Sequence, residues 1–320
     1  MEGASGLNLG LAILCPFLLS LSFMVTLIEH SCPICPQGTP FKIRYPSQFT
    51  PESLQFIARK TPDHAHFRIV RCEGCGLVFS NPIIAPEEII KLYIKSSFIA
   101  EPQLDNMRRD YLNEFRRIMP LIQYDRLLEV GCSNGFFLQE IKKLGFKEAY
   151  GIEPSREAVH HAEASIRPFI LNDQLRSALF PSEHFDVACF FQVFDHIIDP
   201  NNFLQTLHHY LKPQGVLFAI HHNIRSLMPL ILGDKASTYD ISHIHLWDPK
   251  TMKKILEKNG FRVLSIRNTA NSYQLDHILR MLPLANGPKQ NMRHLCRILK
   301  LSDWTIKAKV ENMACVAIKI

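Results

Sequence analysis

The sequence predicts an α/β fold: a doubly wound, parallel sheet of seven strands that follows a small cysteine-rich module. From residue 126 onward, short apolar runs of strand length alternate with stretches of helical periodicity. This alternation is typical of a parallel sheet with helices on both faces. Before that point, two Cys-x-x-Cys pairs stand in a segment with no long apolar run of its own.

Length and composition narrow the class of protein. The chain has 320 residues, 47% hydrophobic and 21% charged, enough for a sizeable core and, at about 100–200 residues per domain, for two domains. These values exclude disordered, collagen-like and small disulfide-rich proteins. The net charge is +6, but residues 250–320 carry fourteen Lys and Arg against four acids, which gives +10 there and −4 in the remainder. This basic end suggests an anionic substrate, RNA or a membrane surface nearby.

Residues 1–29 form an apolar leader. Residues 7–28 are nearly all apolar and, at 22 residues, long enough to cross a bilayer. No Lys or Arg precedes them, Pro16 interrupts them and no clear small-residue cleavage site follows, so a secretory signal is not favoured. The leader is either a membrane anchor or an upstream extension of the reading frame with the functional start at Met24, and we favour the second. We expect a cytoplasmic protein, with membrane contact through residues 7–28 if the leader is retained.

Three further parts follow the leader. Residues 30–82 are rich in Pro, Cys and short polar stretches and are expected to form a zinc-ribbon-like module. Residues 83–120 place acids, bases and apolar residues at helical spacing and are expected to form a helical connector. Residues 121–320 contain the expected strands at 126–131, 149–153, 168–171, 185–190, 215–221, 261–267 and 313–320. We place a substrate cap around residues 222–250 and 270–305.

The two cysteine pairs predict a structural zinc site. Zinc prefers four soft or borderline ligands in a tetrahedron, and each Cys-x-x-Cys turn supplies two thiolates. Cys32 and Cys35 form the first pair, and Cys72 and Cys75 form the second. A closed site of four thiolates leaves no open position, so the metal is expected to hold the ribbon together and do no chemistry. A redox dithiol and plain buried cysteines are the alternatives.

A glycine-bearing turn after the first strand of the sheet is the candidate ligand site. Residues 127–137 combine an apolar strand, a turn and the start of a helix, at the place where doubly wound sheets bind nucleotide-like ligands. The third glycine of the dinucleotide fingerprint is missing, which counts against a nicotinamide-dependent dehydrogenase. Glu129 would repel a diphosphate but suits a cationic amino group, and Glu153 ends the next strand, where a carboxylate can bind both ribose hydroxyls. The pattern fits a ligand with a ribose and a positive aminoacyl tail.

These segments and their order resemble the class I S-adenosylmethionine-dependent methyltransferases. The turn at 127–137 is similar to motif I of that family, and residues 151–155 are similar to the acidic loop that follows it. Residues 185–200, 211–217 and 245–261 resemble the later strands and turns, with Gln214 replacing a glycine. Residues 71–82 are similar to the zinc-ribbon leader found before many bacterial methyltransferases of this type. The resemblance covers about residues 30–320 and implies a Rossmann-like, seven-stranded sheet preceded by the ribbon.

The resemblance implies two bound groups, S-adenosylmethionine as cofactor and the structural zinc. It assigns the methionine end of the cofactor to Glu129 and the glycine turn, the ribose to Glu153 and the adenine edge to residues 172–175. Ser133 stands where many relatives have glycine, and its small side chain still allows close approach. The complete set of expected cofactor-binding residues is Glu129, Gly131, Cys132, Ser133, Asn134, Gly135, Glu153, Pro154, Asp173, Gln174 and Gln192.

Histidines supply the candidate base. Methyl transfer from a sulfonium is an in-line displacement that needs orientation and, for a hydroxyl acceptor, a base, and histidine is the natural base near neutral pH. His196 and His222 follow expected strand ends and, with Asp195, are the expected catalytic residues. Relatives more often carry Glu where this chain has Asp195. The pair His243-x-His245 has no carboxylate or third histidine at metal-binding spacing, so a catalytic metal is not expected.

The expected function is methyl transfer from S-adenosylmethionine to a small-molecule or glycan-like acceptor such as a sugar nucleotide. An anionic acceptor would suit the basic end. Nucleic acid is not favoured, because the Asn/Asp-Pro-Pro-aromatic motif of methyltransferases acting on base amino groups is absent after residue 190. Two alternatives stay open: an RNA methyltransferase that uses the ribbon and the basic end, and a non-catalytic interaction module on the same fold.

Overall fold

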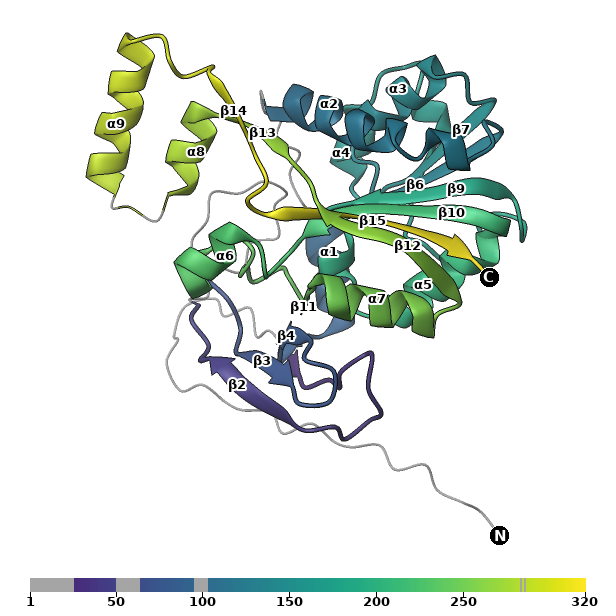
Figure 1. Cartoon of the computed structure of the whole chain (residues 1–320), viewed down its shortest axis with the longest axis horizontal. Helices are drawn as coiled ribbons and strands as arrows, with labels where there is room; N and C mark the ends of the chain where they lie inside the picture. The colour runs from purple at the N-terminus through teal and green to yellow at the C-terminus, as the bar shows by residue number, and fades with distance from the viewer. Residues whose placement is uncertain (1–25, 50–63, 95–102, 283, 285) are drawn as a thin grey trace.

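The computed structural model describes residues 26–49, 64–94, 103–282, 284 and 286–320. Its centre is a sheet of seven strands: β6 (Arg126–Val130), β7 (Glu148–Ile152), β8 (Ile170–Leu171), β9 (Phe185–Phe191), β10 (Leu211–His222), β12 (Phe261–Asn268) and β15 (Asn312–Lys319). Their order in space is β12-β15-β10-β9-β6-β7-β8 (Figure 1). β15 is antiparallel to both of its neighbours, and the pairs from β10 to β8 are parallel. The predicted doubly wound fold is confirmed.

Helices cover both faces of this sheet (Figure 1). α2 (Gln103–Arg116) and α3 (Phe136–Lys143) pack on one face, and α5 (Pro200–Tyr210) and α7 (Pro249–Lys258) pack on the other. Successive strand residues point to opposite faces, so Leu127 lies in the core under α2 and α3 while Leu128 lies in the core under α5 and α7. Every residue of β9 is therefore buried. The helical segment expected as a connector contributes α2 directly to the sheet's core.

The remaining elements lie outside the seven-stranded sheet and the four helices named above. The strands are β1 (Leu27–Ile28), β2 (Phe41–Tyr45), β3 (Ile69–Cys72), β4 (Val78–Ser80), β5 (Ile83–Ile84), β11 (His245–Leu246), β13 (Asn271–Gln274) and β14 (Thr305–Ala308). The α-helices are α1 (Pro86–Ile94), α4 (Arg156–His160), α6 (Leu227–Leu232), α8 (Leu275–Met281) and α9 (Asn286–Ile298). The short 3-10 turns are η2 (Met119–Leu121), η3 (Arg167–Phe169), η4 (Phe194–His196) and η5 (Gly233–Lys235).

The cysteine-rich module is built into the large domain. Its antiparallel sheet has the order β11-β4-β3-β2, so its fourth strand comes from residues 245–246 of the large domain. Leu77 and Phe79 of the module lie in the same apolar core as Leu128 and Trp247. The carbonyl of Pro33 accepts hydrogen bonds from Lys258 Nζ at 2.7 Å and from Asn201 Nδ2 at 2.9 Å. The ribbon thus packs on the face covered by α5 and α7.

The leader falls almost wholly outside the described residues. The membrane contact expected for residues 7–28 and the expected start at Met24 concern residues 1–25, of which nothing is described. The described part begins with a short strand, β1, which pairs antiparallel with β5. No helix in the described ranges is long and apolar enough to cross a bilayer.

Candidate active site

The glycine turn connects the central strand β6 to helix α3. Gly131 and Gly135 both have a φ of 73°, in the left-handed region that favours glycine. A Cβ at Gly131 would lie 2.3 Å from Val193 Cγ2, and one at Gly135 would lie 2.6 Å from Ile166 Cγ2. Both glycines are therefore needed for packing as well as for backbone conformation. Ser133, between them, also has a positive φ of 52°.

Glu153, directly after β7, ties this turn to the loop that follows the strand. Its Oε2 accepts the backbone N–H of Ser133 at 2.9 Å, and its Oε1 accepts the backbone N–H of Ser155 at 2.8 Å. A carboxylate oxygen can accept a second hydrogen bond, so Glu153 can still bind two hydroxyls. The carbonyls of Glu153 and Pro154 both accept from Asn172 Nδ2, which holds the loop in place.

Three buried acceptors around the turn have no hydrogen-bond partner: Glu129 Oε2, Asn134 Oδ1 and Gln192 Oε1. Glu129 is on β6, Asn134 is in the turn and Gln192 directly follows β9, the strand beside β6. Buried polar atoms are normally satisfied, so unpartnered acceptors at one sheet edge point to a ligand that donates hydrogen bonds. Burial, and secondarily the charge of Glu153, raise the pKa of Glu129 well above its usual range.

Two of the expected cofactor-binding side chains are engaged elsewhere. The carboxylate of Asp173 accepts hydrogen bonds from Arg176 at 3.1 and 2.8 Å and from the N–H of Gln174 at 2.7 Å. The bonds from Arg176 hold the pKa of Asp173 below its usual value. The side chain of Cys132 is fully buried under the turn, where a Cβ at Gly151 would lie 2.4 Å from its Sγ. Cys132 can therefore present only its backbone to a ligand.

Asp195 is at the centre of a histidine group at the carboxyl ends of β9 and β10. Its side chain is 2% exposed, and neither carboxylate oxygen has a hydrogen-bond partner. The Nε2 atoms of His243 and His222 lie 3.4 and 4.0 Å from Asp195 Oδ2, and that of His196 lies 3.9 Å from Oδ1. Burial opposes ionisation of Asp195, but the surrounding histidines outweigh burial and lower its pKa. We name Asp195, His196, His222 and His243 the histidine group.

The second ring nitrogen of each of these histidines fixes the tautomer. The Nδ1 atoms of His196 and His243 lie 3.0 Å from the carbonyl of Ser242 and 2.8 Å from that of Thr238. The Nδ1 of His222 lies 3.0 Å from Asn312 Oδ1. These oxygens can only accept, so Nδ1 carries the proton and the Nε2 lone pairs face the carboxylate when the rings are neutral.

The structure brings together the three expected catalytic residues and adds one that the sequence did not indicate. The sequence offered no carboxylate at metal-binding spacing from His243, but the chain between η4 and β11 folds back and places His243 against Asp195. His245, its neighbour in the expected pair, lies apart: its Nδ1 is 3.1 Å from the carbonyl of Ile197 and its ring contacts His30. Burial lowers the pKa of His245 to about 3. His243 and His245 therefore lie in different surroundings and do not face one common site.

A cavity of about 490 Å³ lies away from these residues, between α2 and the strands β12 and β14. Two acids and four bases are among its lining residues, which are Asp110, Asn113, Glu114, Arg117, Arg267, Asn268, Ala270, Lys307 and Lys309. None of the expected site residues lines this cavity. The candidate active site remains the glycine turn and the histidine group, because unpartnered buried acceptors of Glu129, Asn134, Gln192 and Asp195 lie there.

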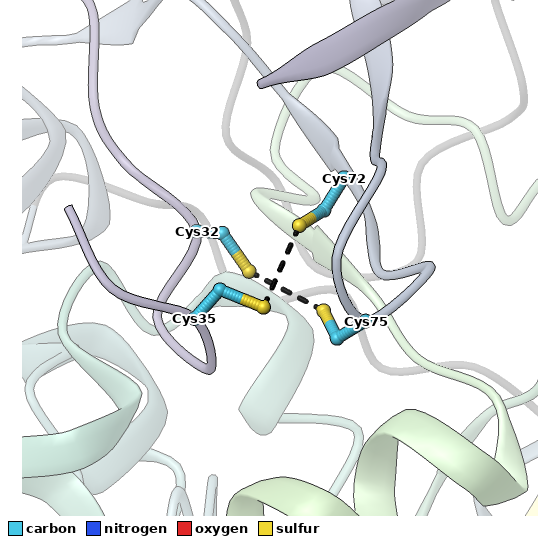
Figure 2. A group of neighbouring side chains, drawn as sticks. All are labelled: Cys32, Cys35, Cys72 and Cys75. Carbon is cyan, nitrogen blue, oxygen red and sulfur yellow. Dashed lines mark hydrogen bonds between the residues drawn. The ribbon is translucent and has the colours of Figure 1, made fainter. Parts of the chain in front are cut away.

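The four cysteine side chains converge from the two turns of the ribbon (Figure 2). Cys32 and Cys75 place their Sγ atoms 3.5 Å apart, and Cys35 and Cys72 place theirs 3.7 Å apart. A disulfide bond would require about 2.05 Å. Four sulfurs at about 2.3 Å from one zinc ion would be about 3.8 Å apart, which is close to the observed spacing. The N–H of Leu77 points at Cys75 Sγ at 3.4 Å, as outer support for a bound thiolate.

The variant Glu129→Gln is expected to stabilise the free protein and weaken cofactor binding. A raised pKa in the folded state means that Glu129 costs stability once the pH rises above the pKa of an exposed glutamate. The variant should therefore unfold at a higher temperature than the wild type at pH 8, with a smaller difference at pH 4. Loss of a charge-assisted bond to an ammonium should weaken binding about tenfold or more in calorimetric titration. Lower stability at pH 8 would show that Glu129 is paired in the free protein.

Comparison with known proteins identifies the family. A family model described as "Methyltransferase domain" matches residues 104–266, just over half of the chain. No curated protein matches the chain. Solved structures of S-adenosylmethionine-dependent methyltransferases that align with it include one from Archaeoglobus fulgidus (19% identity, 66% of this chain and 94% of that one, TM-score 0.47) and one from Aquifex aeolicus (17%, 74% and 99%, 0.45). The family match contains nearly all of α2, the glycine turn and the histidine group, and it shows that this chain belongs to the methyltransferase-domain family that the model describes.

Proposed function

We propose that this chain transfers the methyl group of S-adenosylmethionine to a hydroxyl of a small saccharide-like acceptor, such as a sugar nucleotide. The histidine group carries the proposal. The lone pairs of His196 and His222 lie at the ends of β9 and β10, and β9 is the strand next to the glycine turn. A hydroxyl must lose its proton as it is methylated, and a neutral imidazole is suited to accept it.

The cofactor fits the acceptors that the chain leaves unpartnered. Glu129 would accept from the ammonium of the methionine end, and Glu153 would accept from the ribose hydroxyls. Asn134 and Gln192 supply further acceptors at the same edge. When bound, the cofactor supplies a methyl group on a sulfonium, and its transfer leaves the electron pair of the broken C–S bond on sulfur.

The chain's own residues handle the proton. His196 Nε2 or His222 Nε2 takes it from the acceptor hydroxyl as the oxygen bonds to the methyl carbon. Asp195, 3.9–4.0 Å from both Nε2 atoms, stabilises the imidazolium that forms. Asp195 is therefore a positioning residue in this proposal. Each ring is held by the bond that its Nδ1 makes to an oxygen acceptor.

A small acceptor suits the surroundings of the histidine group. Phe190, Phe191, Gln192 and Val193 stand in place of the Asn/Asp-Pro-Pro-aromatic motif of methyltransferases acting on base amino groups. The basic residues of the last 71 positions favour an anionic acceptor.

We also propose a structural zinc at Cys32, Cys35, Cys72 and Cys75, supported by the spacing of their sulfurs. Four reduced cysteines would suit a reducing, cytoplasmic location, which we propose as well.

The test combines binding and transfer. Calorimetric titration of the whole chain should show micromolar binding of S-adenosylmethionine and none of NAD. Radiolabelled methyl transfer is then assayed against a panel of sugar nucleotides and against RNA. His196→Asn or His222→Asn should lower kcat by about 10²–10⁴-fold and remove the acidic limb of the pH profile, with unchanged affinity for the cofactor.

The matched control is His184→Asn, at the opposite end of β9, which should keep full activity. Label in RNA with a steep salt dependence would establish the RNA methyltransferase instead. A folded protein that binds no S-adenosylmethionine would support the non-catalytic interaction module.

A further inference from the structure

We propose that Asp195, His222 and His243 form a second metal site, for a divalent first-row cation of the Zn²⁺ or Fe²⁺ type. Two imidazoles and one carboxylate are a common ligand set for such ions. The site is separate from the cysteine cluster and lies beside the glycine turn rather than in the ribbon. Metal binding at this place goes beyond methyl transfer and does not depend on it.

The spacing of the ligand atoms carries the first part of the argument. One potential ligand atom from each of the three residues lies within 4.8 Å of the others. Two ligands at about 2.0–2.2 Å from one ion, in tetrahedral geometry, are about 3.3–3.6 Å apart. The 3.4 Å between His243 Nε2 and Asp195 Oδ2 falls in this range, and the 4.0 Å from His222 Nε2 needs only a small side-chain movement.

The chemistry of the facing atoms carries the second part. When their rings are neutral, His222 and His243 place Nε2 lone pairs 4.0 and 3.4 Å from a carboxylate that is 2% exposed and makes no hydrogen bond. A buried carboxylate and a buried imidazole nitrogen that both act as hydrogen-bond acceptors repel each other. A cation bound between them removes this repulsion. An imidazolium–carboxylate pair would bring the atoms to about 2.7–2.9 Å, shorter than the distances observed.

The third part is the outer support of the ligands. Metal-binding histidines almost always donate their other N–H to an oxygen acceptor, which fixes the tautomer and the ring orientation. Here His243 donates to the carbonyl of Thr238 and His222 to Asn312 Oδ1. The segment that contains His243 is itself held by the bond from the N–H of Ile244 to the carbonyl of Asp195, at 2.7 Å. The three ligands are therefore positioned before any ion binds.

The site is also accessible. The side chain of His222 is 19% exposed and that of His196 24%, so the histidine group is open to solvent on one side. Three protein ligands leave at least one coordination position free for water or an oxygen of the acceptor. With His222 used as a ligand, His196 is left to take the proton. This division of roles rests on the proposed function, whereas metal binding itself does not.

The test measures metal binding in the whole chain with zinc already bound by the cysteines. Added Co²⁺ should then bind at one further ion per chain and give ligand-field absorption without thiolate charge-transfer bands. Asp195→Asn and His243→Gln should each weaken this binding at least about tenfold. His245→Gln is the matched control, because it removes a buried imidazole two residues away, and it should bind Co²⁺ like the wild type.

Asp195→Asn provides a second readout that does not depend on activity. Added Zn²⁺ should raise the unfolding temperature of the wild type and leave that of the variant unchanged. Absence of a second Co²⁺ ion in the wild type, or its retention in both ligand variants, would overturn the site. Metal binding without methyl transfer would contradict the proposed function and leave the metal site standing.

Discussion

Cys72→Ser is expected to abolish zinc binding and cofactor binding together. Structural zinc in small modules contributes an apparent 10–16 kcal/mol at neutral pH, comparable to the whole stability of a typical domain, about 5–15 kcal/mol. A ribbon that was joined to the large domain only by a flexible linker would unfold alone, and the rest of the chain would still bind the cofactor. Here Cys72 and Phe79 lie in the same apolar core as Leu128 and Trp247, so loss of the ribbon exposes one face of the central sheet.

The ribbon is also connected to the candidate active site. β11 pairs with β4, with His245 opposite Phe79. The hydroxyl of Ser80 donates to the carbonyl of His243 at 2.9 Å, and the N–H of Ser80 donates to the carbonyl of Ile244 at 2.8 Å. Unfolding of the ribbon would therefore release the segment that places His243 against Asp195.

Three measurements check this prediction: zinc content, thermal unfolding and calorimetric titration with S-adenosylmethionine. Cys296→Ser is the matched control, since it removes a half-buried thiol on α9 outside the cluster, and it should leave all three unchanged. A zinc-free Cys72→Ser protein with wild-type affinity for the cofactor would show that the ribbon folds independently of the sheet.

The features that could be predicted from the sequence are those encoded in short stretches. The seven strands follow from alternating apolar runs, and the glycine turn and the two cysteine pairs follow from spacing within a few residues. The integration of the ribbon could not be predicted in this way, because the two residues of β11 carry no strand signal and form a strand only by pairing with β4.

The histidine group, too, could be predicted from the sequence only in part. His222 ends β10 and His196 lies in the turn η4 that follows β9. The carboxyl ends of these parallel strands share one edge, so the proximity of the two histidines could be predicted. His243 lies in an irregular segment, and its approach to Asp195 depends on the backbone bond from Ile244 to Asp195, which no local pattern encodes. Gln214 has a φ of 62°, so the irregular first part of β10 keeps a conformation that favours glycine even where glycine is absent.

Glu153→Ala is expected to weaken cofactor binding by about 2–4 kcal/mol, or about 30- to 1000-fold. The variant would leave the ribose hydroxyls without their acceptor and would also release the N–H groups of Ser133 and Ser155, which the carboxylate holds. Glu157→Ala, an exposed glutamate in the first turn of α4, is the matched control and should bind like the wild type. Calorimetric titration with S-adenosylmethionine measures both.

A 2′-deoxy analogue of the cofactor separates the two consequences of this variant. If Glu153 binds the ribose, the wild type should lose affinity for the analogue, whereas Glu153→Ala should bind the analogue and the cofactor about equally. If Glu153 only holds the turn through Ser133 and Ser155, the analogue should cost both proteins the same factor. Equal costs would assign the ribose hydroxyls to another acceptor and leave Glu153 as the residue that shapes the turn.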